Sequence, residues 1–269
     1  MPDSRGIVQG RPLVPSVVHA MPHRHAPAAS TLPNVADSPA TSTAGTLALI
    51  GGEEFEEPCK EVDAALLEAS GGTDVLVVPT AAAFENPRRV VETAEAYFKG
   101  FGATVHHVMV LHHAEADDRQ AVAKVRDAGF VYLPGGSPMH LRAVLHGSPL
   151  WEAIQDVYRG GGVLAASGSG AIVLCNPMID PRGGAYTVGL GLVTNMAAFP
   201  HHDTVPEHLW ERVVELRPSG TMLVGIDEHT AAMRVGHDEW RAVGPGKVTV
   251  VGDSSTDTFA AGPMPVLDV

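Results

Sequence analysis

The sequence is poor in cysteine, in basic residues and in long apolar runs. Only two of its 269 residues are cysteines, Cys59 and Cys175, and they form no CxxC pair. A reduced, cytoplasmic protein is the expectation that follows, and a disulfide between the two thiols stays open.

The shortage of basic residues excludes one class of partner. The chain has 18 lysines and arginines against 31 aspartates and glutamates, a formal net charge of −13. A nucleic-acid-binding protein needs clustered lysine and arginine to neutralise phosphates. No apolar run approaches the roughly 18 residues of a bilayer-spanning helix. We therefore expect neither a nucleic-acid nor a membrane partner.

Hydrophobic residues are plentiful, at 45% of the chain, which is enough for the core of one large α/β domain or two small ones. Residues 1–44 differ from the rest, because proline, alanine, serine, threonine and histidine dominate there and the prolines prevent a long helix. We predict a disordered leader over 1–44. A targeting signal, or translation from Met21, stays open as an alternative.

From residue 45 onward, short apolar segments alternate with helical segments. The predicted strands are 46–50, 74–80, 103–111, 130–133 and 163–166, and the predicted helices are 53–69, 87–99, 118–128 and 139–158, the last broken at 147–149. Such alternation is typical of right-handed βαβ units. It predicts an α/β fold in which a mostly parallel sheet lies between two helical layers, a three-layer αβα sandwich.

The end of the chain has a different pattern. One helix is expected over 207–216, and one strand over 222–226. From residue 231 on, short strands joined by glycine-containing turns are expected over 232–235, 239–243 and 247–251. These strands predict an antiparallel finish to the sheet. The α/β domain then covers 45–252, and 253–269 is expected to be a flexible tail.

One stretch predicts a functional site. The strand at 163–166 runs into Ser167-Gly168-Ser169-Gly170, and an apolar helix resumes at once. A strand, a tight turn of small residues and a helix form the geometry of a nucleophile elbow. Glycine turns at 51–52 and 135–136 end two other predicted strands. Because the carboxyl ends of parallel strands meet at one edge of a sheet, these turns and the elbow are expected to lie together.

Two other clusters invite a functional reading. The pairs at 106–107 and 112–113 are histidines, but adjacent strand residues point to opposite faces of a sheet, so neither pair alone builds a metal site. A metal enzyme that uses them is the least favoured reading. The glutamates 53, 54, 56, 57 and 61 lie at the start of the helix predicted over 53–69, where acidic residues suit the helix dipole, and we interpret them as a solvated face.

Five short segments, in order and at suitable spacing, carry a family resemblance. They are Leu49-Ile50-Gly51-Gly52-Glu53, Val78-Pro79-Thr80-Ala81, Leu133-Pro134-Gly135-Gly136, Gly189-Leu190-Gly191-Leu192 continuing to His201, and Gly225-Ile226-Asp227-Glu228-His229-Thr230-Ala231. Through them the chain resembles peptidase family S51, which includes dipeptidase E and cyanophycinase. The resemblance covers about residues 46–251 and implies a flavodoxin-like, class I glutamine amidotransferase-like fold.

The resemblance also implies a chemistry. Members of the family are serine hydrolases that cut short acidic substrates, either Asp-X dipeptides or an isopeptide-linked Asp-Arg polymer. His201 matches the family histidine, and Glu228 matches the glutamate that is the third member in cyanophycinases. The oxyanion hole resembles what the N–H groups of Gly136 and Ser169 would provide. We expect the oxyanion or substrate to be bound at Gly52, Gly135, Gly136 and Ser137.

The elbow departs from the family pattern, G-[ST]-S-A-G-A. When Gly170-Ala171 is aligned on the closing G-A, Gly168 falls on the nucleophile. Glycine cannot attack a carbonyl, and loss of a triad nucleophile costs on the order of a millionfold in turnover in subtilisin. A rival alignment puts Ser169 at the apex, but it requires a one-residue slip that turns the side chain by about 100°. Both alignments stay open.

The sequence thus predicts an S51-type hydrolase scaffold for small acidic peptides or isopeptides, with lost or strongly reduced activity. The alternative is a non-catalytic protein that binds a small acidic molecule or peptide in the preserved cleft. Ser137 stands where cyanophycinases carry another residue, and Arg142 and Arg182 are the candidate cationic partners of an acidic ligand. No metal or organic cofactor is implied, and a homodimer is compatible with the sequence.

Overall fold

The structure is a computed structural model that describes residues 44–265 and residue 267. The predicted leader over 1–44 therefore lies outside the described residues, apart from Ala44. Within the described part of the chain, no helix is both long enough and apolar enough to cross a lipid bilayer.

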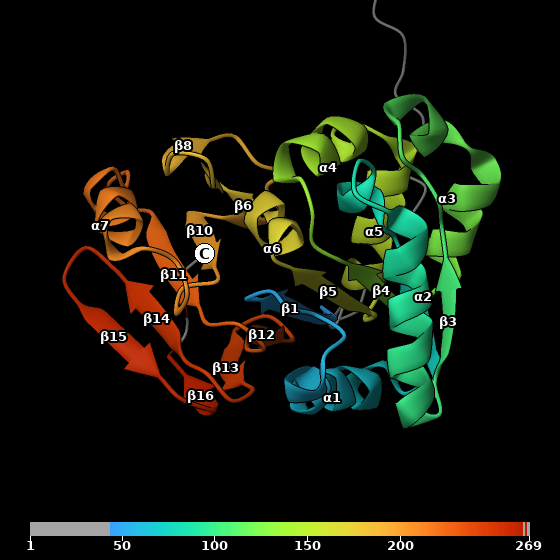
Figure 1. Ribbon diagram of the computed structural model, residues 1–269, viewed down its shortest axis with the longest axis horizontal. Coiled ribbons are helices and arrows are strands. Elements are labelled where there is room, and N and C mark those ends of the chain that lie inside the picture. The colour runs from blue at the N-terminus through green and yellow to red at the C-terminus, as the bar shows by residue number, and fades with distance from the viewer. Residues whose placement is uncertain (1–43, 266, 268–269) are drawn as a thin grey trace, which may run out of the picture. The chain divides into compact units, whose positions relative to one another are not determined.

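The larger sheet has eight strands, five of which are parallel and form its central part and one edge (Figure 1). In sheet order the parallel strands are β1 (Thr46–Ile50), β5 (Val163–Ser167), β4 (Phe130–Leu133), β2 (Asp74–Val77) and β3 (Thr104–His107). Beyond β1 the sheet continues through three antiparallel strands, β12 (Ala231–Val235), β13 (Glu239–Val243) and β16 (Gly262–Met264). The predicted parallel sheet is confirmed, and so is its antiparallel finish for the strands at 231–235 and 239–243. The strand predicted at 247–251 belongs instead to a second sheet.

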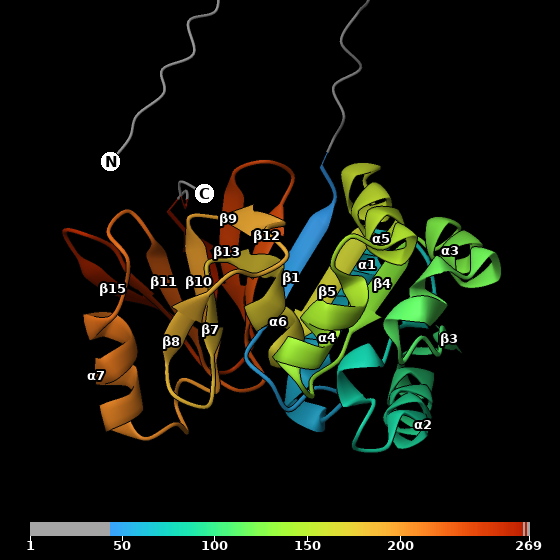
Figure 2. The ribbon, with the colours of Figure 1, turned by 90° about the horizontal axis from the view of Figure 1, so that it is seen from above.

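Side chains alternate between the two faces of this sheet, and on each face they pack against a layer of helices. Leu47 and Leu49 of β1 pack in one cluster, and Ala48 and Ile50 pack in another. The first cluster contains residues of α3 (Arg119–Arg126), α4 (Pro138–Leu145), α5 (Pro149–Arg159) and α6 (Ser169–Leu174), and the second contains residues of α1 (Lys60–Ser70) and α2 (Pro87–Phe98). Figure 1 shows α1 on one side of β1 and β5 and α4, α5 and α6 on the other, and Figure 2 shows α4 and α6 in front of the sheet. The three-layer αβα prediction is confirmed.

Local sequence sets the helix starts. The Asn86 side chain accepts a hydrogen bond from the Arg89 N–H at 3.2 Å, and Pro87 occupies the first helical position of α2. Serine side chains cap α4 and α5 in the same way, each before a proline. Short 3-10 turns complete the connections: Glu57–Cys59, Thr80–Ala82, Lys99–Phe101 and His113–Asp117. The third predicted strand is shorter than expected, because it ends at His107 rather than at residue 111.

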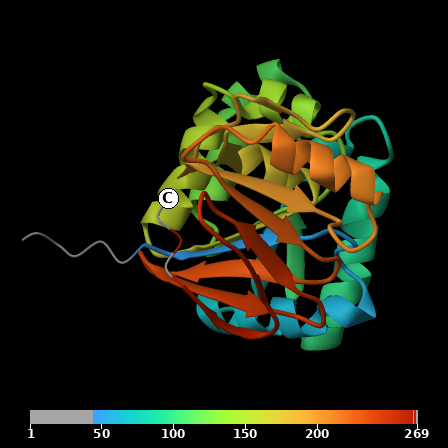
Figure 3. The same cartoon turned by 90° about the vertical axis from the view of Figure 1, so that its left-hand side faces the viewer.

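A second sheet of six strands was not predicted. Its order is β15 (Thr256–Phe259), β14 (Val248–Val251), β11 (Met222–Ile226), β10 (Met196–Pro200), β6 (Cys175–Asn176) and β9 (Val193–Thr194). Figure 3 looks onto this sheet, with β14 and β15 in red. The helix α7 (Glu207–Glu215) packs on it through Val213, which shares a cluster with Phe199 and Leu223. A two-stranded hairpin, β7 (Met178–Asp180) and β8 (Ala185–Thr187), lies between β6 and β9 in the chain.

Residues 256–264 are not part of the flexible tail that the sequence analysis predicted for 253–269. They contain β15, which pairs with β14, and β16, which pairs with β13. Thr258 and Thr249 hydrogen-bond across the first of these pairs at 3.1 Å, and Met264 is buried opposite Trp240 in the second. Pairing with the preceding strand β14 and with the more distant β13 holds these two strands in the sheets, and local hydrophobicity alone does not indicate it.

The two sheets meet where the carboxyl ends of their strands lie. The Gly51 carbonyl, after β1, accepts a hydrogen bond from the His201 N–H, after β10, at 2.8 Å. The Gly51 N–H in turn donates to the Thr230 carbonyl, between β11 and β12, at 2.8 Å. Residues that follow β1, β10 and β11 are therefore brought to one place, as the rule for open parallel sheets predicts.

Candidate active site

A histidine and a carboxylate form a pair at this junction. Nδ1 of His201 lies 2.9 Å from Oε1 of Glu228, and the Thr204 hydroxyl donates to the same oxygen at 2.9 Å. The Glu228 N–H donates to the Asp203 side chain, also at 2.9 Å. The hydrogen bond from His201 lowers the pKa of Glu228, opposed by partial burial. An anionic Glu228 orients the imidazole and leaves Nε2 available.

Gly168 occupies the corner between β5 and α6. Its backbone has φ 51° and ψ −109°, a conformation that side-chain-bearing residues rarely adopt and that is typical of functional turns. A Cβ added to Gly168 would lie 3.7 Å from Nε2 of His201, with Gly135 Cα at 3.8 Å. A hydroxyl on that carbon would be within hydrogen-bond reach of the imidazole. The corner is thus in place, and its residue has no side chain.

Ser169 does not point at the imidazole. It is the first residue of α6, it is nearly buried, and its hydroxyl donates a hydrogen bond to the Gly136 carbonyl. That bond ties the helix start to the loop after β4. The one-residue slip that would place Ser169 at the corner does not occur in this structure.

The loop after β4 brings three of the expected binding residues beside the corner. Gly136 has φ 138°, and a Cβ there would lie 2.4 Å from the Ala81 backbone. Within residues 44–265 no protein group accepts a hydrogen bond from the Gly136 N–H, and the Ser169 N–H has no intrahelical acceptor at a helix start. Ser137 has a structural role: its hydroxyl accepts a hydrogen bond from the His140 N–H and caps the start of α4.

Glu54 braces the corner, which sequence reasoning missed. Its carboxylate accepts a hydrogen bond from the Ser167 hydroxyl at 2.6 Å and another from the Gly135 N–H at 2.7 Å. The bonds join the segment after β1 to the ends of β5 and β4. The sequence showed only a run of glutamates before a helix, a pattern that most often means a solvated face. No local signal distinguishes the bracing glutamate from its neighbours.

Glycine at position 52 is required by the imidazole. A Cβ on Gly52 would lie 2.2 Å from Cε1 of His201, closer than any real contact. Glu53, His201 and His229 also have positive φ values, of 54°, 57° and 58°. Several strained residues around one junction are typical of functional sites. Glu53, His201 and Glu228 each offer a ligand atom within 4.8 Å of the others, so two carboxylates flank the imidazole.

A small cavity of about 250 Å³ opens beside the corner. Gly136, Gly168, Ser169 and His201 line one side of it. The apolar part of the lining includes Ile172, Ile179, Phe199, Val205 and Leu209. Neither arginine proposed as a cationic partner lines it, and Arg182 instead pairs with Asp180 at 2.6 Å.

The other histidines lie elsewhere. His202 pairs with Asp227 at 3.0 Å, and its ring packs against Trp210 with a centroid distance of 4.4 Å. A Cβ on Gly225 would lie 2.6 Å from that ring, so His202 faces the second sheet rather than the cavity. Among the described residues, the group with metal-ligand spacing contains none of the four histidines at 106–107 and 112–113.

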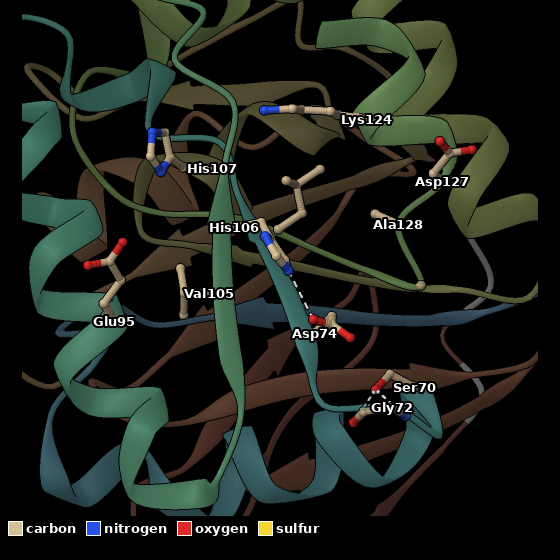
Figure 4. A pocket seen from close by; sticks show the side chains of 12 residues that line it. Ser70, Gly72, Asp74, Glu95, Val105, His106, His107, Lys124, Asp127 and Ala128 are labelled. Carbon is tan, nitrogen blue, oxygen red and sulfur yellow. Dashed lines mark hydrogen bonds and ion pairs between the residues drawn. The ribbon is translucent and has the colours of Figure 1, made fainter. Parts of the chain in front are cut away.

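A larger cavity, of about 720 Å³, lies at the β3 edge of the first sheet (Figure 4). His106 points toward Asp74 there, at 2.9 Å. Its lining includes Gly72 and Gly129, which precede β2 and β4, so the cavity reaches the amino ends of the parallel strands. Sites in such sheets form at the carboxyl ends. The smaller cavity beside Gly168 is therefore the better candidate.

Comparisons with known proteins agree with this geometry. A family model described as "Peptidase family S51" matches residues 47–241. A protein named "Cyanophycinase" from Synechococcus elongatus is 26% identical over 220 residues, which covers 77% of this chain and 68% of that protein.

Two solved structures are similar to this one. The crystal structure of a peptidase from an acI-B1 actinobacterium superposes with a TM-score of 0.75 at 29% identity, and the match covers 84% of this chain and 98% of that one. A structure titled as a putative peptidase E protein from Listeria monocytogenes gives a TM-score of 0.55 at 17% identity, covering 81% and 99%. At that identity the second likeness concerns the fold alone.

Proposed function

The chain belongs to peptidase family S51, and from that premise we propose that it is a hydrolase scaffold whose peptidase activity is lost or strongly reduced, a pseudoenzyme. One observation carries the proposal: the corner residue is Gly168, and the position of its missing Cβ is 3.7 Å from Nε2 of His201. The base and its orienting carboxylate are in place, and the hydroxyl that they would activate is absent.

The remaining groups have roles that follow from their positions. In an enzyme with serine at 168, the hydroxyl would attack a peptide carbonyl and His201 would take its proton, while Glu228 would hold the imidazolium. The N–H groups of Gly136 and Ser169 would face the oxyanion. Gly168 removes the first of these steps and leaves the groups that bind and polarise a carbonyl.

Substitution of the corner residue tests the proposal. We expect Gly168→Ser to gain hydrolysis of short peptides, on the order of a hundredfold or more above Gly168→Ala. The alanine variant is the matched control, because it carries the same backbone strain without the hydroxyl. Equal activity of the two folded variants would show that more than the nucleophile has been lost.

The second candidate function is a non-catalytic binding protein that uses the same cleft. The hydrogen bond between the Ser169 hydroxyl and the Gly136 carbonyl favours it, because that serine is held away from His201. A fluorophosphonate probe followed by peptide mass spectrometry separates the two. Labelling of Ser169 in the natural protein would support an enzyme that uses it, whereas folded protein without label would support the binder.

An acidic peptide or isopeptide is the ligand that the family resemblance favours, but the residues that line the cavity supply no lysine or arginine for it. We also propose a cytoplasmic location, which two buried, unbridged cysteines support. A homodimer stays a prediction that light scattering on the purified protein would check.

A further inference from the structure

The cavity beside Gly168 has the position of a specificity pocket. It shares Gly136, Gly168 and His201 with the candidate active site, so a carbonyl held against the Gly136 N–H places the adjoining side chain at its mouth. The rest of its lining comes from distant segments: Ile172 on α6, Ile179 on β7, Phe199 on β10, and Leu209 on α7. Both sheets and the hairpin therefore contribute to it.

The size of the cavity suits one side chain. An engineered cavity of about 150 Å³ lined by leucine, isoleucine and phenylalanine stays dry and binds benzene. The cavity here, about 250 Å³, is larger, and its apolar lining includes isoleucine, leucine and phenylalanine as well, beside the polar Ser169 and His201. It therefore has room for a branched aliphatic or an aromatic group.

Charge around the cavity argues against an acidic side chain. Carboxylates of Glu53 and Glu228 lie beside His201, one of its lining residues. Two basic side chains on neighbouring segments are engaged elsewhere: Arg182 with Asp180, and Arg212 with the Gly183 carbonyl at 2.8 Å. Arg142, the other candidate cationic partner, does not line the cavity. A ligand carboxylate would enter a largely apolar cavity whose lining includes no lysine or arginine and whose histidine is flanked by two carboxylates, which is unfavourable.

From these observations we propose that the cavity takes an apolar side chain of leucine or phenylalanine size from a peptide, and that the protein disfavours acidic peptides. This inference rests on the proposed function for the position of the peptide carbonyl. It departs from the acidic ligand that the family resemblance implies. The rim residues Val205 and Leu209, which are half-buried, and the buried Ile179 and Phe199 determine the preference.

Binding to the natural protein tests this inference without need of catalysis. The probes are Ala-Leu-Ala, Ala-Phe-Ala, Ala-Asp-Ala and Ala-Ala-Ala, titrated by calorimetry and by ligand-observed NMR. We expect the leucine and phenylalanine peptides to bind roughly tenfold or more tighter than the other two. Equal binding of all four, tighter binding of the aspartate peptide, or no binding at millimolar concentration would overturn the inference.

A variant of the rim sharpens the test. Leu209→Arg places a cation at the cavity and should abolish the preference for leucine while raising the affinity for the aspartate peptide. Leu216→Arg is the matched control, because Leu216 is exposed just after α7 and does not line the cavity. Both variants are first checked for a native melting transition. An unchanged preference in a folded Leu209→Arg protein would contradict the assigned pocket.

Failure here and failure of the proposed function are distinguishable. If the peptides show no preference but Gly168→Ser gains hydrolysis of aspartyl peptides, the scaffold proposal stands and the pocket assignment falls. If the natural protein reacts with the fluorophosphonate at Ser169, the lost-activity proposal falls whatever the peptides show.

Discussion

At the scale of single residues, the absence of a side chain at position 168 has a consequence for stability as well as for chemistry. With φ at 51°, any other residue at the corner is held in a strained backbone conformation. The two nearest atoms to an added Cβ are at ordinary contact distance, so there is no steric clash to add to this strain. Glycine therefore relaxes the turn.

We predict that Gly168→Ala and Gly168→Ser each lower the free energy of unfolding by about 1–3 kcal/mol, because each forces a side-chain-bearing residue into this conformation. Urea unfolding of the three proteins measures the effect. An alanine variant as stable as the natural protein would show that the corner is not strained.

Ser169 belongs to the same turn but has a structural task. We predict that Ser169→Ala lowers the free energy of unfolding by about 1–2 kcal/mol, because the Gly136 carbonyl loses its donor. In the Gly168→Ser background the same substitution should leave peptide hydrolysis within about tenfold. If it abolished hydrolysis in that background, Ser169 would be the nucleophile and the corner assignment would be wrong.

At the scale of elements, Glu54 connects three strand ends through two hydrogen bonds. We predict that Glu54→Ala lowers the free energy of unfolding by about 2–4 kcal/mol, because the Gly135 N–H and the Ser167 hydroxyl both lose a charged acceptor. Glu54→Gln keeps one acceptor oxygen and should lower the free energy of unfolding by less than half as much as Glu54→Ala. Glu57→Ala, on an exposed side chain of the same acidic run, is the control.

The buried Asp63 gives the packing of α1 against α2 a pH dependence. Asp63 is fully buried, the Tyr97 hydroxyl donates to it at 2.8 Å, and burial raises its pKa to about 7. In the unfolded chain its pKa is about 3.8. The folded state therefore binds the Asp63 proton more tightly than the unfolded chain does. This contribution to the free energy of unfolding is fully present below about pH 4 and is lost as the pH rises to about 7.

We predict that Asp63→Asn removes this slope and raises the free energy of unfolding at pH 8 by up to about 4 kcal/mol, since no charge then has to be buried. Urea unfolding from pH 4 to pH 8 measures it, with Asp117→Asn, an exposed aspartate, as control. A variant whose stability keeps the natural pH slope would contradict the assignment.

Element positions were largely predictable, and side-chain roles were less so. Alternating apolar segments with glycine turns located β1, β4 and β5 to within a few residues, since burial on both faces of a parallel sheet leaves a strong local signal. The helix predicted over 53–69 begins only at Lys60. Glu54 and the apolar cavity could not be predicted, because each depends on contacts between segments far apart in sequence. The second sheet was missed for the same reason.

At the scale of the whole molecule, the last described strands complete both sheets. β15 covers the edge of β14, and β16 covers the edge of β13. We predict that a chain ending at residue 252 aggregates or melts at least several degrees lower, because two strand edges lose their partners. Differential scanning calorimetry of the two chains measures this, and an unchanged melting temperature would mean that the two strands contribute nothing to the fold.

The central claim is that the molecule keeps the base, the orienting carboxylate and the oxyanion amides of a serine hydrolase, and lacks only the hydroxyl at its corner. The most direct test is the rate of fluorophosphonate labelling at position 168, mapped by mass spectrometry. It would be measured in Gly168→Ser, in Gly168→Ser with His201→Ala, and in the natural protein. We predict rapid labelling of Ser at 168 in the first, a loss of at least about a hundredfold in the second, and no labelling in the third. Labelling of the natural protein at Ser169, or a folded Gly168→Ser protein that does not react, would contradict the account.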